Sequence, residues 1–387
     1  MPGFVGIDAT LWRNRRGYGR FARNAVEALV AADPTVRYRL YVDPETAPFV
    51  AVPGAELRCV RLERRPDVAA ADGSSRGPRD LLRFARAVHA DAPDAFLVTS
   101  LLTYVPIPGV PLVVGLHDTI PHELPELVLP DRRARALWRL KERDAIRRAA
   151  RLFTVSSASR ASLAKAFGLP PERLSVVPEA PDPVFTRAAG AEPPLPVPPG
   201  EPFVLCAAGG ISPHKNVETL LEAYARLTDG APRLVVVGAL GDETYASSAS
   251  SVGARASRLG LGDRVVFPGY VPDDVLAALY RRATVVVNPS RAEGFGLTAV
   301  EAAACGAPLL LSDLPAHRET LGRAALLFDP LDAGELAARL DELLADEGLR
   351  SRVALRCAEA VAGRSWAAAG LALSKLVHAA MNGRTRG

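Results

Sequence analysis

The chain has 387 residues, of which 49% are hydrophobic and 23% are charged. This length exceeds one ordinary domain, and this composition excludes a wholly disordered chain. The formal net charge of +4 is too small for a dedicated nucleic-acid binder, but it is compatible with a ligand that carries phosphate.

Cysteine usage and the hydrophobic pattern bear on the location of the protein. The four cysteines are scattered without a CxxC pair, which is typical of small buried side chains in a reducing cytoplasm; they are Cys59, Cys206, Cys305 and Cys357. The first residues, MPGFVGIDAT, lack a basic segment followed by an apolar one, and no run of about 18 apolar residues occurs. We therefore expect a cytoplasmic protein with neither a signal peptide nor a membrane span.

Short apolar runs alternate with longer helical patterns along the whole chain. In the first half they predict strands at residues 4–8, 37–42, 57–62, 95–100, 112–118, 151–156 and 174–179, and helices at residues 17–32 and 133–150. After a proline-rich segment without periodicity, strands resume at residues 203–210, 233–239, 264–269, 284–290, 307–313 and 324–330, and a last helix follows at residues 364–381.

This alternation predicts an α/β protein with two Rossmann-like, doubly wound domains, because apolar strands separated by helices form parallel sheets covered on both faces. The predicted N-terminal domain covers residues 1–185, a linker covers residues 186–201, and the predicted C-terminal domain covers residues 202–364. Residues 365–387 form the terminal helix. Ligands of such sheets bind at the carboxyl ends of the strands, so we expect the active site in the cleft between two such edges.

The stretch RAEGFGLTAVEAAACG follows a predicted strand and enters a helix near Gly296 or Leu297. The first amides of that helix have no partner within the helix, so those of Phe295, Gly296 and Leu297 can face a phosphate. Glu301 lies one turn deeper on the same face and can accept hydrogen bonds from a diol such as a ribose. Glu293 lies in the loop on the other side of the phosphate position. The alternative is a capped helix with solvated acids.

Two further polar groups follow predicted strands. In AAGGISPHKN, Lys215 stands where a helix opens near Asn216, and a cation there is unfavourable unless an anion lies between it and the helix. The alternative is an exposed lysine. His117 and Asp118 end the strand LVVGLHD, where a histidine can face a ligand or be a satisfied structural residue.

The segment GYGRFA fits the pattern GxGxxA, and an acidic residue, Asp43, follows the next strand. A dinucleotide fingerprint needs its first glycine directly after the strand, but residues 9–16 separate Gly17 from the strand that ends near Asp8. An NAD-dependent enzyme is therefore a remote alternative. We favour a glycine loop, at Gly17 and Gly19, that lets the backbone of the first domain approach a ligand.

No motif for a metal or a hydrolytic triad stands out. HExxH, a Walker loop and a DxD triplet do not occur. We therefore expect no metal site and no metal dependence.

Two other segments have an unusual composition. Residues 64–80 are expected to form a mobile loop of the first domain. Residues 131–151 are dense in arginine and include Trp138, so they can lie on an anionic membrane face, with peripheral attachment to the inner membrane, or form a packed helix with a solvated basic face.

At these residues the sequence resembles family 4 of the retaining glycosyltransferases, which have the GT-B fold. The mark of that family is a pair of glutamates separated by seven residues in EGFG…E, matched here from Glu293 to Glu301. The resemblance covers nearly the whole chain and includes GYGR, HD, TVSSASR, SPHKN, VFPGYVPDDVLAALY and the SW of the last helix.

The resemblance implies roles for residues of the second domain. Lys215 and the amides of residues 295–297 would bind the diphosphate of a nucleotide sugar. Glu301 would hold the ribose, and Glu293 would contact the transferred sugar. The base would be bordered by Gly269, Tyr270 and Val271.

The resemblance also implies roles for the first domain. His117 would line the sugar pocket, so that Glu293, His117 and Lys215 are the catalytic candidates. The entry loop with Gly17, Gly19 and Arg20 would close on the phosphate, and the terminal helix would pack back on the first domain. The implied activity is metal-independent transfer of a hexosyl group, with retention, to a glycan, a lipid-linked acceptor or a small molecule.

The sequence departs from the family pattern at two places. Gly210 occupies a position where members commonly carry an arginine that would contact the diphosphate, and PEA at residues 178–180 replaces the usual PNG. GGISPHKN and LHDTIPHELPE resemble mannosyltransferases most, which favours GDP-mannose as donor. The alternatives are a GT-B nucleotide-sugar epimerase and a non-catalytic nucleotide-sugar binder.

Overall fold

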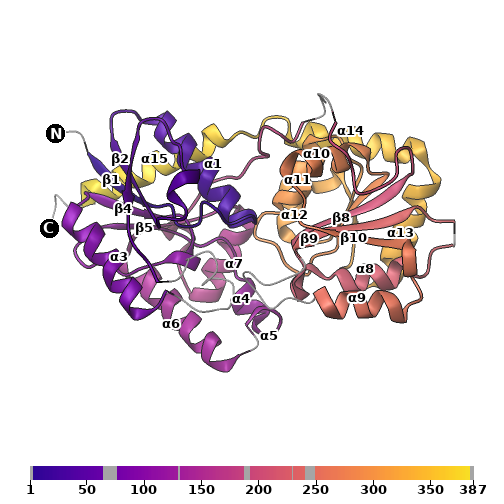
Figure 1. The fold of residues 1–387 in the computed structure, drawn as a ribbon, viewed down its shortest axis with the longest axis horizontal. Coiled ribbons are helices and arrows are strands. Elements are labelled where there is room, and N and C mark those ends of the chain that lie inside the picture. Colours follow the sequence, from indigo (N-terminus) through magenta and orange to yellow (C-terminus); the bar gives the residue numbers. More distant parts are fainter. Residues whose placement is uncertain are drawn as a thin grey trace. The chain divides into compact units, whose positions relative to one another are not determined.

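The computed structural model describes residues 3–63, 76–129, 131–186, 192–228, 230–239 and 249–383. These residues form two compact units: the first comprises those up to residue 179 and those from residue 365, and the second comprises those from 180 to 364. Each unit is a parallel sheet with helices on both faces (Figure 1), which confirms the predicted α/β fold class.

The first unit contains a seven-stranded sheet in the order β3-β2-β1-β4-β5-β6-β7, and every pairing in it is parallel. The strands are β1 (Phe4–Asp8), β2 (Arg37–Val42), β3 (Ala55–Cys59), β4 (Ala95–Val98), β5 (Leu112–Gly115), β6 (Ala149–Thr154) and β7 (Leu174–Val176). The order reverses between β1 and β4. Because β1, β4 and β5 are buried throughout, they read as continuous apolar runs in the sequence.

Helices of the first unit cover both faces of its sheet. On one face α1 (Gly17–Ala32) packs along α15 (Trp366–Gly383), and the opposite face carries α3 (Pro78–Asp91) and α6 (Arg132–Arg148) (Figure 1). Shorter helices are α4 (Ile120–Glu123), α5 (Pro125–Val128) and α7 (Ser157–Phe167), with 3₁₀ turns η1 (Ala47–Phe49), η2 (Leu101–Thr103) and η3 (Pro171–Arg173).

The contact between α1 and α15 joins two ends of the chain within one core. A Cβ on Gly370 would lie 2.3 Å from the carbonyl oxygen of Ala28, so glycine permits the close approach of the helices. Asp33 accepts hydrogen bonds from Ser374 Oγ at 2.9 Å and from His378 Nε2 at 2.6 Å. The last helix is therefore an integral part of the first unit.

The second unit contains a six-stranded parallel sheet in the order β10-β9-β8-β11-β12-β13. The strands are β8 (Phe203–Gly210), β9 (Arg233–Ala239), β10 (Val265–Gly269), β11 (Val285–Asn288), β12 (Leu309–Ser312) and β13 (Leu326–Phe328). The order reverses between β8 and β11, and a ligand of such a sheet binds at the carboxyl ends of the strands that flank this reversal.

Two groups of helices cover the faces of this second sheet (Figure 1). One group is α8 (Val217–Tyr224), α9 (Ala249–Arg258) and α13 (Ala333–Ala345), and the other is α10 (Asp273–Arg282), α11 (Leu297–Ala304) and α14 (Glu347–Val361). The short elements are α12 (Pro315–Thr320), η4 (Pro213–Lys215), η5 (Gly262–Arg264) and η6 (Gly322–Ala324). None of the helices in the described part of the chain is long and apolar enough to cross a membrane.

Three expectations about local structure were wrong. Pro78–Asp80, expected in a loop, form the first turn of α3, where proline at the start suits a helix; residues 64–75 lie outside the described residues. Cys59 is exposed because β3 is an edge strand. The expected glycine loop at Gly17 and Gly19 is instead the first turn of α1.

Candidate functional site

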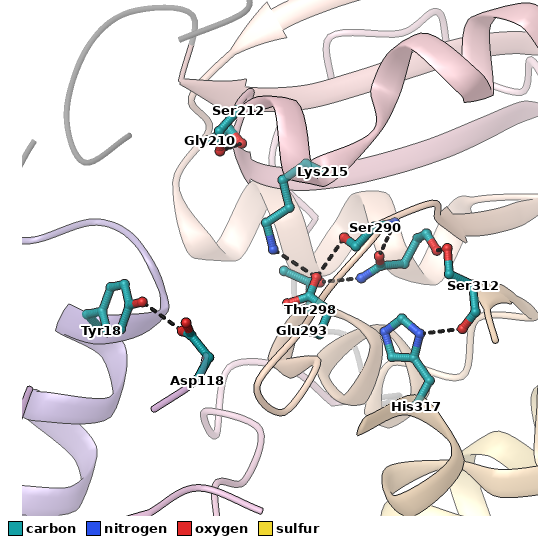
Figure 2. A network of polar contacts seen from close by, with 11 residues as sticks. Tyr18, Asp118, Gly210, Ser212, Lys215, Ser290, Glu293, Thr298, Ser312 and His317 are labelled. Atoms are coloured by element: carbon teal, nitrogen blue, oxygen red, sulfur yellow. Dashed lines mark hydrogen bonds and ion pairs between the residues drawn. The ribbon is translucent and has the colours of Figure 1, made fainter. Parts of the chain in front are cut away.

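The loops after β8 and β11 meet at the carboxyl edge of the second sheet (Figure 2). Asn216 joins them, because its Nδ2 donates to the carbonyl oxygens of Pro289 at 2.9 Å and of Pro330 at 2.8 Å. The backbone amide of Arg291 donates to the carbonyl oxygen of His214 at 2.8 Å. Asn216 has a left-handed backbone with a φ of 58°, which ends the turn η4 and starts α8, as the sequence predicted.

Lys215 and Glu293, predicted from separate motifs, form an ion pair across this edge. Lys215 Nζ lies 2.8 Å from Glu293 Oε1, and Ser290 Oγ donates to the same oxygen at 2.7 Å. Burial alone would raise the pKa of Glu293, but the charge of Lys215, with a smaller contribution from His317, lowers that pKa to about 2. The carboxylate is therefore ionised at any physiological pH.

Helix α11 begins beside this pair, at Leu297 as predicted. Its N-cap, Gly296, has a φ of +86°, and no side chain among the described residues caps the helix. Phe295 and Leu297 are buried, so this turn offers backbone amides rather than side chains to a ligand. An uncapped N-terminus beside a cation is a favourable position for an anion.

A hydroxyl and amide network holds the turn in place. Asn288 Nδ2 donates to Thr298 Oγ1 at 3.2 Å, and Asn288 Oδ1 accepts from the amide of Ser290 at 3.2 Å. Glu301, on the second turn of α11, is fully buried. The structure thus brings the predicted residues Lys215, Glu293 and those of the α11 N-terminus together.

His317, on α12, is a functional candidate that sequence reasoning missed. Its Nδ1 donates to the carbonyl oxygen of Ser312 at 2.8 Å, and the other nitrogen lies on the ring edge that faces Glu293 (Figure 2). A Cβ on Gly296 would lie 2.9 Å from this ring. Burial lowers the pKa of His317, against the opposing charge of Glu293.

The neutral form of His317 has a defined tautomer. Nδ1 carries the ring proton, since it donates a hydrogen bond to the carbonyl oxygen of Ser312. Nε2 is therefore unprotonated and presents a lone pair. Nε2 is buried and has no hydrogen-bond partner among the residues that the structure describes. Its position four residues after a predicted strand, residues 307–313, was a signal that could have found it, because His117 was selected for its place at a strand end.

Two other predicted groups lie on the same sheet. Gly210 ends β8 after an irregularity at Gly209, whose φ is +69°, and its carbonyl oxygen accepts from the amide of Ser212 at 2.9 Å. Gly269 and Tyr270 lie at the end of β10, the edge strand, which β9 and β8 separate from β11. Tyr270 is exposed, whereas Val271 is buried.

In the first unit, His117 follows β5 and is buried. Its Nε2 donates to the carbonyl oxygen of Thr99 at 2.7 Å, and its ring packs edge-on against Phe21 with centroids 4.7 Å apart. Burial lowers the pKa of His117 to about 4, although the hydrogen bond to Thr99 opposes this. The imidazole is therefore neutral, with Nδ1 as its acceptor nitrogen.

The predicted Gly17–Arg20 segment lies near His117. Tyr18 stands 5.2 Å from the imidazole, centroid to centroid, and its hydroxyl donates to Asp118 Oδ2 at 2.9 Å (Figure 2). A Cβ on Gly19 would lie 1.9 Å from the carbonyl oxygen of Asn14, so the glycine serves chain packing. Arg20 is buried.

Among the described residues, no group of three or more His, Cys, Asp or Glu side chains is placed to hold a metal ion.

Comparison with known proteins assigns a family to both units. Residues 193–357 match the model described as "Glycosyl transferases group 1", and residues 16–180 match "Glycosyl transferase 4-like domain". The 2-deoxystreptamine glucosyltransferase of Streptomyces kanamyceticus is 31% identical over 83% of this chain and 80% of its own length.

A second relative and one solved structure extend the comparison. The D-inositol 3-phosphate glycosyltransferase of Streptomyces bingchenggensis is 32% identical over 72% of this chain, but the match spans only 63% of that relative's length. The structure of sucrose-phosphate synthase from Thermosynechococcus elongatus aligns with a TM-score of 0.78 at 21% identity, over 97% of this chain and 98% of that one. At this identity the similarity is one of fold alone.

Proposed function

The chain belongs to the group 1 glycosyl transferases with the GT-B fold, and on that premise we propose that it transfers a hexosyl group from a nucleotide diphosphate sugar to a hydroxyl, with retention of anomeric configuration. The observation that carries this proposal is the Lys215–Glu293 pair beside the uncapped start of α11. A cation and a helix N-terminus fit a diphosphate, and an ionised carboxylate fits sugar hydroxyls.

In the proposed reaction, the bond between the anomeric carbon and the diphosphate breaks while a bond to the acceptor oxygen forms on the same face. The proton of the acceptor hydroxyl passes to the departing phosphate oxygen. Negative charge grows on the diphosphate as it leaves, so Lys215 and the α11 amides lower the barrier by stabilising that charge.

Glu293 acts in this proposal as a positioning and electrostatic group. Its pKa of about 2 makes it a weak base and a weak nucleophile, which argues against a role as proton acceptor. Donor binding would draw Lys215 from the carboxylate to the diphosphate and leave Glu293 to accept from the hydroxyls of the sugar. Glu301 is proposed to hold the ribose; the sugar contact of His117 stays a prediction.

The acceptor is proposed to be a small polyol bound by the first unit. The relatives' names mention inositol phosphate and 2-deoxystreptamine, and both are six-membered carbocyclic polyols. The proposed donor remains a hexose nucleotide, with GDP-mannose as the prediction from sequence.

A donor panel tests this function. We expect either UDP or GDP sugars to raise the melting temperature, because a ligand that binds only the native state stabilises it. Transfer is then assayed with the best donor, and the anomeric configuration of the product is read by NMR. An epimerised sugar from donor alone would replace the transferase proposal by an epimerase, and binding without any turnover would leave a nucleotide-sugar binder.

Peripheral membrane attachment through α6 is a separate proposal. Leu137 and Leu140 are exposed at 57% and 66%, and Arg139 and Arg143 lie on the same helix. Such a helix suits an anionic lipid surface. Co-sedimentation with phosphatidylglycerol vesicles and with phosphatidylcholine vesicles tests this attachment. We expect more protein in the phosphatidylglycerol pellet, and equal recovery in both pellets would contradict the proposal.

A further inference from the structure

Arg364 follows α14, the last helix of the second unit, and its side chain contacts the turn that starts α11. Its backbone amide donates to the carbonyl oxygen of Val361 at 3.0 Å, directly after α14. The side chain is partly buried and reaches two neighbouring elements. The guanidinium carbon lies 5.4 Å from the centre of the Phe295 ring, which is a cation–π contact. Nη2 donates to the carbonyl oxygen of Thr320 at 3.2 Å.

These two contacts involve both neighbours of Gly296, the N-cap of α11. Phe295 directly precedes Gly296 in the chain. Thr320 ends α12, the helix whose His317 ring would lie 2.9 Å from a Cβ on Gly296. One arginine therefore fixes the elements around the peptide groups that, in the proposed function, face the diphosphate. Such support affects function, because a small displacement of preformed ligand-binding groups weakens their action strongly.

The charge of Arg364 is poorly compensated by the protein. Burial lowers the pKa of Arg364, and the opposing charge of Glu319 comes from an exposed side chain. Nε of Arg364 is buried and has no hydrogen-bond partner within the described part of the chain. A cation that is partly removed from water without an ion-pair partner costs stability. An apolar side chain would fill the same space at a lower cost, so the retained cation indicates a role towards an anion.

The anion site at the start of α11 benefits from a further cation. Gly210 supplies no charge at the end of β8. Lys215 Nζ lies 2.8 Å from Glu293 Oε1, so its charge is partly neutralised before a ligand binds. A guanidinium beside Phe295 adds positive potential at the turn without touching the ligand, because charge interactions extend beyond contact distance where water screens them little.

We propose that Arg364 is a positioning residue of the nucleotide-sugar site: it holds Phe295 and α12 in place around Gly296 and puts a positive charge beside the start of α11. The inference deepens the proposed function and rests on it for the identity of the anion. Arg364 acts through Phe295 and Thr320 and makes no contact with the donor. Its effect is therefore expected in the affinity for the diphosphate, beyond any effect on the stability of the fold.

The first test measures nucleotide affinity in the full chain by isothermal titration calorimetry, with UDP and GDP as probes. Arg364→Met keeps a long side chain but removes the charge and the hydrogen bond to Thr320. We expect it to weaken the binding of whichever nucleotide the wild type binds by about tenfold. Arg364→Lys keeps the charge and loses the planar stacking group, so it should recover an affinity within about threefold of the wild type.

Arg350→Met is the matched control. Arg350 belongs to the same unit, and its Nη1 donates to the carbonyl oxygens of Leu343 and Leu344, each at 2.8 Å, at the end of α13. Removing these bonds should lower the melting temperature and leave the nucleotide affinity unchanged. Equal weakening of nucleotide binding in Arg350→Met and Arg364→Met would reduce Arg364 to a general contributor to stability and overturn the inference.

A second measurement does not need a nucleotide. Amide hydrogen exchange, read by mass spectrometry, reports local opening of the chain. Arg364→Met should speed exchange in residues 293–300 and 315–321, and Arg350→Met should leave exchange there unchanged. Unchanged exchange in Arg364→Met, or wild-type nucleotide affinity in that variant, would overturn the inference. If the wild type bound neither UDP nor GDP, the proposed transferase function would fail, while faster exchange would still support the positioning of the turn by Arg364.

Discussion

The carboxyl edges of the two sheets share a topology and differ in chemistry. Both sheets reverse their strand order near the middle, between β1 and β4 and between β8 and β11. The second edge combines Lys215, ionised Glu293 and an uncapped helix start, which suits an anion. The first edge presents carboxyl groups, a neutral histidine and aromatic rings. The loops, rather than the fold, therefore determine which ligand each edge accepts.

Helix starts show the same contrast on a smaller scale. In α7 the Ser156 hydroxyl accepts from the amide of Ser159 at 2.9 Å, so this N-terminus is satisfied by the protein itself. Gly296 gives α11 no such side chain. Helices α3 and α10 also begin without a side-chain cap, so the position of the α11 start beside Lys215, and not the missing cap alone, is what suits an anion.

The largest expected effect is at the anion edge. Lys215→Ala should lower kcat for sugar transfer by about a hundredfold or more, because it removes a charge that stabilises the leaving diphosphate. Steady-state kinetics with the best donor measure this. Lys165→Ala, at an exposed lysine of the first unit, is the control and should leave kcat unchanged. Near-normal turnover in Lys215→Ala would show that the anion site had been assigned to the wrong sheet edge.

The turn at Gly296 gives the next effect. Gly296→Ala places a methyl group 2.9 Å from the His317 ring at a φ of +86°, so we expect a loss of stability of about 2 kcal/mol or more together with weaker nucleotide binding. Urea unfolding and a UDP or GDP titration measure the two. Gly200→Ala is the matched control, since Gly200 has a φ of +82° and its Cβ would meet nothing within 4 Å; equal losses in both variants would contradict the packing argument.

Two glutamates, Glu293 at the second edge and Glu142 at the first, should respond to pH with opposite signs. The pKa of Glu293 is lowered, so its contribution to stability is full above its unfolded pKa and is lost as pH falls towards 2. The pKa of Glu142 is raised, so ionising it costs stability as pH rises from about 4.5 to 7.

Glutamine variants test these signs in each unit. At pH 8, Glu293→Gln should lower the free energy of unfolding and Glu142→Gln should raise it, each by roughly 1–3 kcal/mol. At pH 4 the Glu142→Gln gain should be nearly absent. Urea unfolding at both pH values measures this, and the same sign in both variants would refute the proposed difference between the edges.

His317 gives the smallest effect and the finest distinction. Asn can keep the hydrogen bond to Ser312 but lacks an atom at the Nε2 position, whereas Gln reaches the Nε2 position. If the Nε2 lone pair accepts a hydrogen bond from the bound sugar, His317→Gln should retain more kcat than His317→Asn, by about tenfold, at similar melting temperature. Equal kcat values in the two variants would show that His317 contributes packing and no hydrogen bond to catalysis.

Much of the architecture could be predicted from sequence. The bounds of β1, β2, β8, β9 and α1 match the predicted segments. Buried parallel strands such as β1 read as uninterrupted apolar runs, and α1 shows the helical spacing of its buried residues. The edge strand β3 begins two residues earlier than predicted, since its mostly exposed side chains give no such run.

The pairings within the sites could not be predicted in the same way. Lys215 and Glu293 are 78 residues apart and meet only because β8 and β11 are neighbours in the sheet. Trp138 and Glu142 lie among arginines that suggested a solvated face; their burial depends on packing against the loop after β5 and against α7. Periodicity describes one element at a time, whereas these contacts belong to several.

The packing of α15 on α1 has a consequence for biosynthesis. Gly370 and His378 complete the first unit, yet they emerge from the ribosome after the whole of residues 180–364. The second unit is continuous in the chain and can fold during translation, while the first must wait with the α15-covered face of α1 open. We therefore expect the usual N-terminal-first order of domain folding to be reversed in this protein, with chaperone demand centred on the half of the molecule that is made first.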